Sequence, residues 1–293
     1  MIRVAILGST GQLGTDLVEV LRQDNRFEVV PLAHQEADCT KAAEIREVIA
    51  KLRPDDVVNC AAFVRVDDCE DRPDLAFEVN AVGAFNVARA CAAVDACCIH
   101  ISTDYVFDGS KESPYVESDA PNPINVYGAS KLAGEYLVRQ AAPRWLIVRV
   151  ASLFGKTGAR GKGGNFIETI ISKAKSGHAL RIVDDIKISP TYARDAAAVI
   201  CDLLGTSASG IVHAANSGCC TWYEFAKTTL TLCGLTVPVE PVASSAYPVR
   251  ANRPRNSVLS TERLDRGLRF KSPTWQTALR AYLLERKHFP VAP

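Results

Sequence analysis

Short apolar runs of strand length alternate with longer amphipathic segments along the first 150 residues. This alternation predicts βαβ units, and strands that are apolar on both faces fit a parallel sheet covered by helices on both sides. The sequence therefore predicts an α/β protein with a doubly wound sheet. The predicted strands are 2–7, 27–32, 57–60, 97–101 and 145–150, and the predicted helices are 12–23, 41–52, 74–94 and 126–140.

Beyond residue 150 the alternation is less regular. Residues 155–164 contain five glycines and three Lys/Arg residues, which predicts a mobile loop or lid. A strand is expected at 211–214, and Thr221 with Glu224 forms a capping-box pattern at the start of a helix. A last helix is expected from Ser272. We expect this part to pack against the sheet as a smaller domain.

The composition is typical of a globular enzyme. Of the 293 residues, 47% are hydrophobic and 23% charged, and the net charge of +1 gives no field that would attract nucleic acid or a membrane surface. No apolar stretch approaches the ~20 residues of a membrane span, and the N-terminal run is too short for a signal peptide. None of the ten cysteines forms a CxxC pair and the five histidines lack zinc-ligand spacing. We expect reduced thiols, a cytoplasmic location and no metal site.

The segment 249–271 carries seven basic and two acidic residues. One interpretation is a solvated basic face, and the other is an anion site. For the anion site we expect Arg253 or Arg255, because arginine binds phosphate through paired N–H donors. Arg255 is favoured, since Asn256 and Ser257 follow it and can add hydrogen bonds.

A glycine motif, GxxGxxG, lies directly between the first predicted strand and the first predicted helix. Glycine permits a tight turn and close approach of the backbone to a diphosphate, and a helix N-terminus supplies free N–H groups. In this position the motif predicts dinucleotide binding. The residues expected to contact the cofactor are Gly8, Thr10, Gly11, Gln12, Leu13 and Gly14.

The end of the second strand bears on which dinucleotide is used. The residue that reads the ribose is expected near His34, but no acid ends the strand, and Glu36 and Asp38 come later. An acid there would repel a 2′-phosphate, so we expect NADPH to be accepted at least as well as NADH. Asp38 has two open interpretations, an adenine contact or a cap for the helix near Lys41.

Candidate catalytic groups follow the fourth strand and begin the fourth helix. Tyr127 and Lys131 are four residues apart and share one helix face, while Ser102 and Thr103 end the strand. Reduction of a ketone needs a proton donor, and an ammonium beside tyrosine is expected to lower the phenol's pKa. A hydroxyl can hold the carbonyl oxygen. A solvated Tyr/Lys pair is the alternative, but with the glycine motif the set predicts a reductase.

These residues lie in segments that carry a family resemblance. The chain resembles the dTDP-4-dehydrorhamnose reductases, extended short-chain dehydrogenases, over nearly its whole length, most specifically in "STDYVFDG" (102–109), "NPINVYGASKLAGE" (122–135), "SPTYARD" (189–195) and "RPRNSVLS" (253–260). The resemblance implies NAD(P)H-dependent reduction of the C4 ketone of dTDP-4-dehydro-L-rhamnose. It implies catalytic roles for Thr103, Tyr127 and Lys131, substrate contacts at Thr103 and Asp104, and cofactor contacts at Gly11 to Leu13, Asp38, Cys39, Ala61, Ala62 and Phe63.

The resemblance also sets the expected organisation. Residues 1–150 form the dinucleotide-binding Rossmann domain, and residues 151–293 are mainly a substrate-binding domain with segments that return to the Rossmann core. The expected partner is a nucleotide-sugar, with a second copy of the chain as a candidate partner.

Two departures bear on the identity of the sugar. Ser152 stands where the family often has a tryptophan, and the glycine-rich insertion 155–164 is longer than usual. Two alternatives therefore remain. One is a 4-ketoreductase for another dTDP-deoxysugar. The other is a non-catalytic nucleotide-binding subunit resembling the beta subunit of methionine adenosyltransferase.

Overall fold

The computed structural model describes residues 1–158, 164–265 and 269–289 and is built on one six-stranded sheet. The strands lie in the order β10-β5-β4-β3-β1-β2, and every neighbouring pair is parallel. The expectation of a doubly wound parallel sheet is therefore confirmed. The strands are β1 (Ile2–Leu7), β2 (Phe27–Leu32), β3 (Asp56–Asn59), β4 (Cys97–Thr103), β5 (Trp145–Val150) and β10 (Gly210–Ala214).

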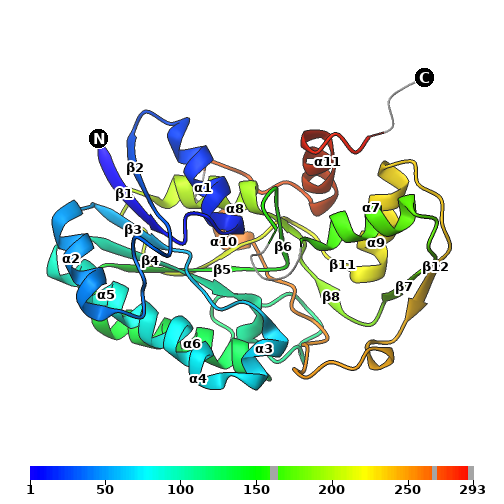
Figure 1. The fold of residues 1–293 in the computed structure, drawn as a ribbon, viewed down its shortest axis with the longest axis horizontal. Coiled ribbons are helices and arrows are strands. Elements are labelled where there is room, and N and C mark those ends of the chain that lie inside the picture. Colours follow the sequence, from blue (N-terminus) through cyan, green and yellow to red (C-terminus); the bar gives the residue numbers. More distant parts are fainter. Residues whose placement is uncertain (159–163, 266–268, 290–293) are drawn as a thin grey trace.

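Helices cover both faces of this sheet (Figure 1). On one face α1 (Gln12–Arg22) packs against α8 (Ala193–Leu203). On the other face α5 (Gly83–Ala93) lies between α2 (Ala42–Leu52) and α6 (Val126–Ala141). The two helix layers explain why the central strands are apolar on both faces.

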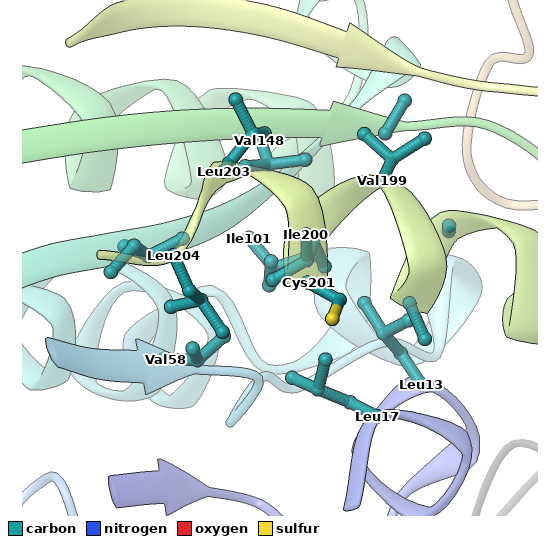
Figure 2. Close-up of a cluster of buried hydrophobic side chains, with 14 of the residues drawn as sticks. Leu13, Leu17, Val58, Ile101, Val148, Val199, Ile200, Cys201, Leu203 and Leu204 are labelled. Carbon is teal, nitrogen blue, oxygen red and sulfur yellow. The ribbon is translucent and has the colours of Figure 1, made fainter. Parts of the chain in front are cut away.

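The core under α1 and α8 fixes the helix that follows the glycine motif. Figure 2 shows Leu13 and Leu17 of α1 facing Val199 and Ile200 of α8 and the sheet residue Val58. Burial of each such leucine stabilises the fold by about 1.5–3 kcal/mol. The packing of Leu13 and Leu17 in this core therefore fixes the position of the α1 N-terminus.

A smaller lobe lies at the carboxyl edge of the sheet (Figure 1). Its core is a cluster of aromatic rings that includes Phe154, Phe225 and Tyr282, with ring centroids 5.5 to 5.6 Å apart around Phe154. The elements of this lobe are β6 (Leu153–Phe154), α7 (Phe166–Lys175), β7 (Leu180–Val183), β8 (Lys187–Ile188), β9 (Thr191–Tyr192), β11 (Cys220–Thr221), α9 (Trp222–Leu232), β12 (Val239–Val242), η3 (Ser244–Ala246) and α11 (Trp275–Glu285).

The segment 250–260, here called the strap, returns from this lobe to the first half of the chain. Asn125 Nδ2 donates to the carbonyl oxygen of Asn252 at 2.9 Å, and Arg253 pairs with Asp67 at 2.7 Å. The strap leads into α10 (Glu262–Asp265), which contacts β10. Since α8, β10 and the strap all follow residue 150, later segments do contact the sheet or its loops, and the division into domains at residue 150 stays a prediction.

Two element predictions were wrong in detail. The helix expected over 74–94 is α4 (Pro73–Phe77), a π-helical segment η1 (Glu78–Val82) and α5, preceded by α3 (Val66–Asp71). The last helix begins at Trp275 rather than Ser272, because Thr274 is its N-cap and a bridge to Ser217 holds the preceding residues extended. The capping box at Thr221 and Glu224 is confirmed. No helix in the described ranges is long and apolar enough to cross a membrane.

A charged cluster joins α1 to α11. Lys156 Nζ lies 2.9 Å from Glu19 and 2.8 Å from Glu285, and Glu285 also accepts hydrogen bonds from Tyr192 and Arg194. Lys156 belongs to the glycine-rich segment expected to be a lid, whose residues 159–163 lie outside the described part of the chain.

Asp16 lies in this cluster, and its carboxylate is buried without a hydrogen-bond partner among the described residues. Burial raises its pKa to about 6. The native state thus binds more protons than the unfolded chain between about pH 4 and 6, and stability is lost as the pH rises through that window. We expect Asp16→Asn to raise the free energy of unfolding at pH 8 by about 1–2 kcal/mol, discounted for solvent screening.

The measurement is urea unfolding of both proteins at pH 4 and pH 8. At pH 4 the variant and the wild type should agree, because both then carry a neutral side chain. A variant that is no more stable at pH 8 would show that the Asp16 carboxylate is stabilised by its neighbours.

Candidate active site

One cavity of about 520 Å³ lies at the carboxyl ends of the strands. The glycine motif, the loop after β3 and the end of β4 line it on the sheet side, together with the start of α6. It contains every residue expected to contact the cofactor except Gly14, together with Thr103 and Asp104. Such a position, beyond the carboxyl ends of a parallel sheet, is where α/β proteins bind ligands.

The glycine motif leaves no room for side chains. Gly8 has φ +70°, and a Cβ on Gly8 would lie 2.9 Å from the backbone nitrogen of Ala61. A Cβ on Gly14 would lie 2.3 Å from the carbonyl oxygen of Gly8, so Gly14 serves the close packing of the turn rather than the cavity surface. The first N–H groups of α1 have no intrahelical partner and can bind a diphosphate. This geometry fits a dinucleotide.

The loop 61–63 lines the cavity and is held by Asn80, a residue of the π-helical segment. Asn80 Oδ1 accepts from the backbone nitrogen of Phe63 at 2.8 Å, and its Nδ2 donates to Phe63 oxygen and to Ser130, both at 3.0 Å. The widened turn of η1 brings Asn80 to these partners. π-Helical turns often mark functional sites, but the spacing of apolar residues does not reveal one.

Asp38 and Glu36 differ in position at the end of β2. Asp38 lines the cavity and accepts hydrogen bonds from the backbone and hydroxyl of Thr40. The helix-cap alternative is wrong, since the N-cap of α2 is Lys41 and no side chain caps it. Glu36 lies outside the cavity and accepts from the backbone nitrogen of Ala33 at 2.8 Å. His34 and Thr40 are the other residues at this end of the cavity.

Tyr127 and Thr103 both line the cavity. Tyr127 is the second residue of α6, whose N-cap Asn125 accepts from Gly128 nitrogen at 2.8 Å. The Tyr127 ring stands edge-on to Tyr105 at 6.0 Å. Burial raises the pKa of Tyr127 above its ordinary value, partly offset by a hydrogen bond with Thr103. The expected lowering by Lys131 is therefore wrong for this geometry, and Tyr127 is a neutral phenol with a proton to give.

Lys131 lies one turn further along α6 and is buried. Its Nζ donates to the carbonyl oxygen of Ile101 at 2.6 Å and lies 3.3 Å from Nε2 of His100. Burial lowers the pKa of Lys131 to about 8, and Glu135 opposes this shift. The ammonium is thus directed at the end of β4 rather than at solvent, so the alternative of a solvated Tyr/Lys pair is wrong.

His100 is a neighbour of Lys131 that the sequence did not single out. It is fully buried, and burial lowers its pKa well below the ordinary value, with Lys131 adding to the shift. Its second nitrogen, Nδ1, lies 3.5 Å from Nδ2 of Asn59, whose Oδ1 accepts from Ala61 nitrogen. His100 is therefore neutral and links Lys131 to the loop that lines the cofactor end of the cavity.

Asp104 lines the same cavity beside Thr103. Burial raises its pKa to about 6, and the hydrogen bond that Asp104 accepts from Thr103 limits the rise. Thr103 Oγ1 donates to Asp104 at 3.0 Å. Burial also raises the pKa of Tyr105 above its ordinary value. Beside Thr103 the cavity is thus lined by one carboxyl group, Asp104, and two phenols, Tyr105 and Tyr127.

A buried ion pair between Glu135 and Arg149 supports the candidate catalytic residues. Glu135 accepts two hydrogen bonds from Arg149 at 2.8 and 2.7 Å and one from Ser102 at 2.5 Å, and the Glu135 and Arg149 side chains are only 2% and 1% exposed. Tyr127, Lys131 and Glu135 are spaced four residues apart on α6, so one helix face carries all three. The pair joins α6, β4 and β5 directly under the cavity.

The basic segment contributes differently from what the sequence suggested. Arg253 is occupied by Asp67 and by the carbonyl oxygen of Ala251 at 2.7 Å. Arg255 is exposed and is not among the described residues that line the cavity, so its contact with substrate stays a prediction. Within the described ranges no three His, Cys, Asp or Glu side chains are placed to hold a metal ion.

The chain is similar to known proteins over most of its length. The family model described as the RmlD substrate binding domain matches residues 2–287. The spore coat polysaccharide biosynthesis protein SpsK of Bacillus subtilis is 37% identical, with 98% of each chain covered. A dTDP-4-dehydrorhamnose reductase of Burkholderia thailandensis is 36% identical over 94% of this chain and 96% of its own. A dTDP-4-keto-6-deoxy-D-glucose reductase of Streptomyces niveus is 38% identical over 88% of each.

Among solved structures, the dTDP-4-dehydrorhamnose reductase of Bacillus anthracis in complex with NADP superimposes with a TM-score of 0.91. It is 38% identical, and the match covers 97% of this chain and all of that one. Sequence and fold thus agree over nearly the whole length. The chain belongs to the family described as the RmlD substrate binding domain.

Proposed function

We propose that this protein reduces the C4 ketone of dTDP-4-dehydro-L-rhamnose to dTDP-L-rhamnose with NADPH. The observation that carries the proposal is the meeting of Thr103, Tyr127 and Lys131 with the glycine motif in one cavity. A nicotinamide dinucleotide, when bound, supplies the hydride. The names of the reductases from Burkholderia thailandensis and Bacillus anthracis, and the NADP in the latter structure, support this choice.

The protein's own groups supply the proton and the orientation. The neutral phenol of Tyr127 donates its proton to the oxygen at C4 as charge develops there. The hydroxyl of Thr103, which donates to Asp104 in this structure, turns to donate to the same oxygen when the substrate is bound. Lys131, which lines the same cavity and donates to Ile101, is proposed to stabilise the phenolate left on Tyr127 through its positive charge, and Cys39, Ala61 and Phe63 line the cofactor end.

NADPH is expected to bind at least as well as NADH. Glu36 does not line the cavity and accepts a hydrogen bond from the backbone of Ala33, so among the described lining residues only Asp38 is acidic at this end of the cavity. Competitive titration of the two cofactors measures the preference. A strong preference for NADH would show that Asp38 takes the role of the ribose-binding acid.

The proposed reaction is tested by a coupled assay from dTDP-glucose with the preceding dehydratase and epimerase. Consumption of NADPH and identification of dTDP-L-rhamnose support the proposal. Formation of a different 6-deoxysugar from an alternative keto-sugar would favour the second candidate, to which the Streptomyces niveus relative and Ser152 in the cavity wall point. Nucleotide binding with no turnover of either would favour a non-catalytic subunit.

Dehydration of dTDP-glucose is a further outcome of the same assay. Elimination needs an acid and a base beside Thr103, and this chain has Asp104 followed by Tyr105. Since burial raises the pKa of Tyr105, even less of this side chain than in water is the phenolate that could act as a base at neutral pH. With dTDP-glucose and catalytic NAD alone, we expect no 4-keto-6-deoxy product, and its steady accumulation would overturn the reductase assignment.

Arg255 is proposed to contact the substrate diphosphate. Replacement by alanine should raise KM several-fold more than it lowers kcat, because a diphosphate contact serves binding rather than chemistry. Arg253→Ala is the comparison variant, since Arg253 is already paired with Asp67. An unchanged KM for Arg255→Ala would return this stretch to the solvated-face interpretation.

We also propose that the protein is cytoplasmic. None of the ten cysteines, all of which lie in the described ranges, forms a disulfide, which suits the reducing cytoplasm, and a nucleotide-sugar is the proposed partner. A homodimer stays a prediction, to be measured by sedimentation.

A further inference from the structure

Trp222 is where the smaller lobe reaches the active-site cavity. Among the described residues, it is the only one after Leu153 that lines the cavity. The other lining residues belong to the segment 8–152 and to Leu153 of β6. Among the described residues the smaller lobe thus contributes Leu153 of β6 and the ring of Trp222, and the proposed reaction gives that ring no role.

The backbone of Trp222 is held firmly. It is the first residue of α9, directly after the N-cap Thr221, which forms the capping box with Glu224. The hydroxyl of Thr221 also donates to Asp184 at 2.6 Å. The helix start is therefore tied to the segment before β8, and the position of the tryptophan is preorganised.

The indole ring is supported on the side away from the cavity. Phe166 lies 4.7 Å away between ring centroids and tilted by 59°, and Phe225 lies 6.5 Å away. These rings belong to the core of the smaller lobe. Trp222 itself is only half-buried, and its N–H makes no hydrogen bond with the described residues. It therefore presents an apolar ring and an unused donor to the cavity.

The other two tryptophans have different surroundings. Trp275 is 5% exposed and packs in the core of the smaller lobe against Phe225. Trp145 lies at the start of β5 with the guanidinium of Arg139 5.4 Å above its ring. Neither lines the cavity, so the open indole is particular to position 222.

We propose that the ring of Trp222 packs against the glycosyl unit of the nucleotide-sugar and thereby positions its C4 carbonyl at Thr103 and Tyr127. This inference rests on the proposed function. A 6-deoxyhexose presents C–H groups and a methyl group beside its hydroxyls, which suits an aromatic face with one N–H donor. The glycosyl unit is favoured over the base because Trp222 shares its cavity with the two residues that act on the sugar.

The decisive comparison is between dTDP-L-rhamnose and dTDP, which differ only by the sugar. Calorimetric titration of the protein loaded with NADP should show that Trp222→Ala weakens dTDP-L-rhamnose binding at least about fivefold and leaves dTDP binding unchanged. Trp222→Phe should retain part of the affinity. Tyr223→Ala is the matched control, since Tyr223 is the next residue of α9, is also half-buried and does not line the cavity.

Fluorescence gives a second readout, in which Trp222 itself is unchanged. The double variant Trp145→Phe/Trp275→Phe leaves Trp222 as the single tryptophan. Its emission should change on addition of dTDP-L-rhamnose and not on addition of dTDP. Equal responses to both ligands would place the base, not the sugar, on Trp222 and overturn the inference.

Kinetics separate this inference from the proposed function. The keto-sugar KM of Trp222→Ala should rise at least fivefold while NADPH affinity stays at the wild-type value. A wild-type protein that reduces the keto-sugar beside a Trp222→Ala variant with unchanged constants overturns the role of Trp222 alone. A wild-type protein without turnover overturns the proposed function instead.

Discussion

Replacing Tyr127 by phenylalanine should lower turnover by at least about 100-fold, the usual scale of general acid catalysis. The phenol is the buried neutral group that meets Thr103 in the cavity, and burial keeps its proton in place by raising its pKa. Phenylalanine keeps the ring and its edge-on contact with Tyr105 but has no proton to give. Single-turnover rates with NADPH and the keto-sugar measure the loss.

The control for this variant is cofactor binding. The Kd for NADPH should change less than threefold, because the glycine motif and loop 61–63 are untouched. Tyr105→Phe is the matched variant, since Tyr105 lies beside Tyr127 in the same cavity and should retain much more activity. Near-wild-type turnover by Tyr127→Phe would remove Tyr127 from the mechanism.

Replacing Glu135 by alanine should destabilise the protein by about 3–5 kcal/mol. The change leaves the guanidinium of Arg149 buried and without its carboxylate, and it removes the acceptor of the Ser102 hydroxyl. Urea unfolding followed by circular dichroism measures the loss. Glu19→Ala is the matched control, because Glu19 is an acid in the partly exposed ion pair with Lys156 and should cost no more than about 1 kcal/mol.

A double variant shows whether the penalty comes from the unpaired charge. Glu135→Leu with Arg149→Met removes both charges and should recover most of the lost stability. A Glu135→Ala protein within 1 kcal/mol of the wild type would mean that water reaches Arg149. Equal losses in the single and double variants would point to packing rather than charge.

The sheet was predictable because each strand is a compact apolar run between helix-length segments. The glycine motif and the pair Tyr127 and Lys131 were predictable because their chemistry depends on neighbours within a few residues. Asn80 and His100 were not, because each acts on a segment that is distant in sequence. Contacts between segments that are distant in sequence have no fixed spacing by which they could be recognised.

Two errors have the same physical origin. Tyr127 was expected to have a lowered pKa because Lys131 is one helical turn away, yet burial dominates and Ile101 and His100 engage the lysine. The last helix was expected to begin at Ser272, yet a bridge to Ser217 holds the chain extended up to Thr274. In both cases a tertiary contact overrides what the local sequence pattern predicts.

The position of β10 in the sheet has a consequence for synthesis of the chain. When the ribosome has made residues 1–150, β5 is complete, but its outer edge lacks the partner that arrives only with residues 210–214. The apolar face of α1 is likewise uncovered until α8 appears. The nascent chain therefore carries an open strand edge and a bare core for some 60 residues of translation, a state prone to aggregation. The edge of β5 and the apolar face of α1 are covered only when β10 and α8 have emerged. The first half of the chain therefore cannot complete its core before the second half is made.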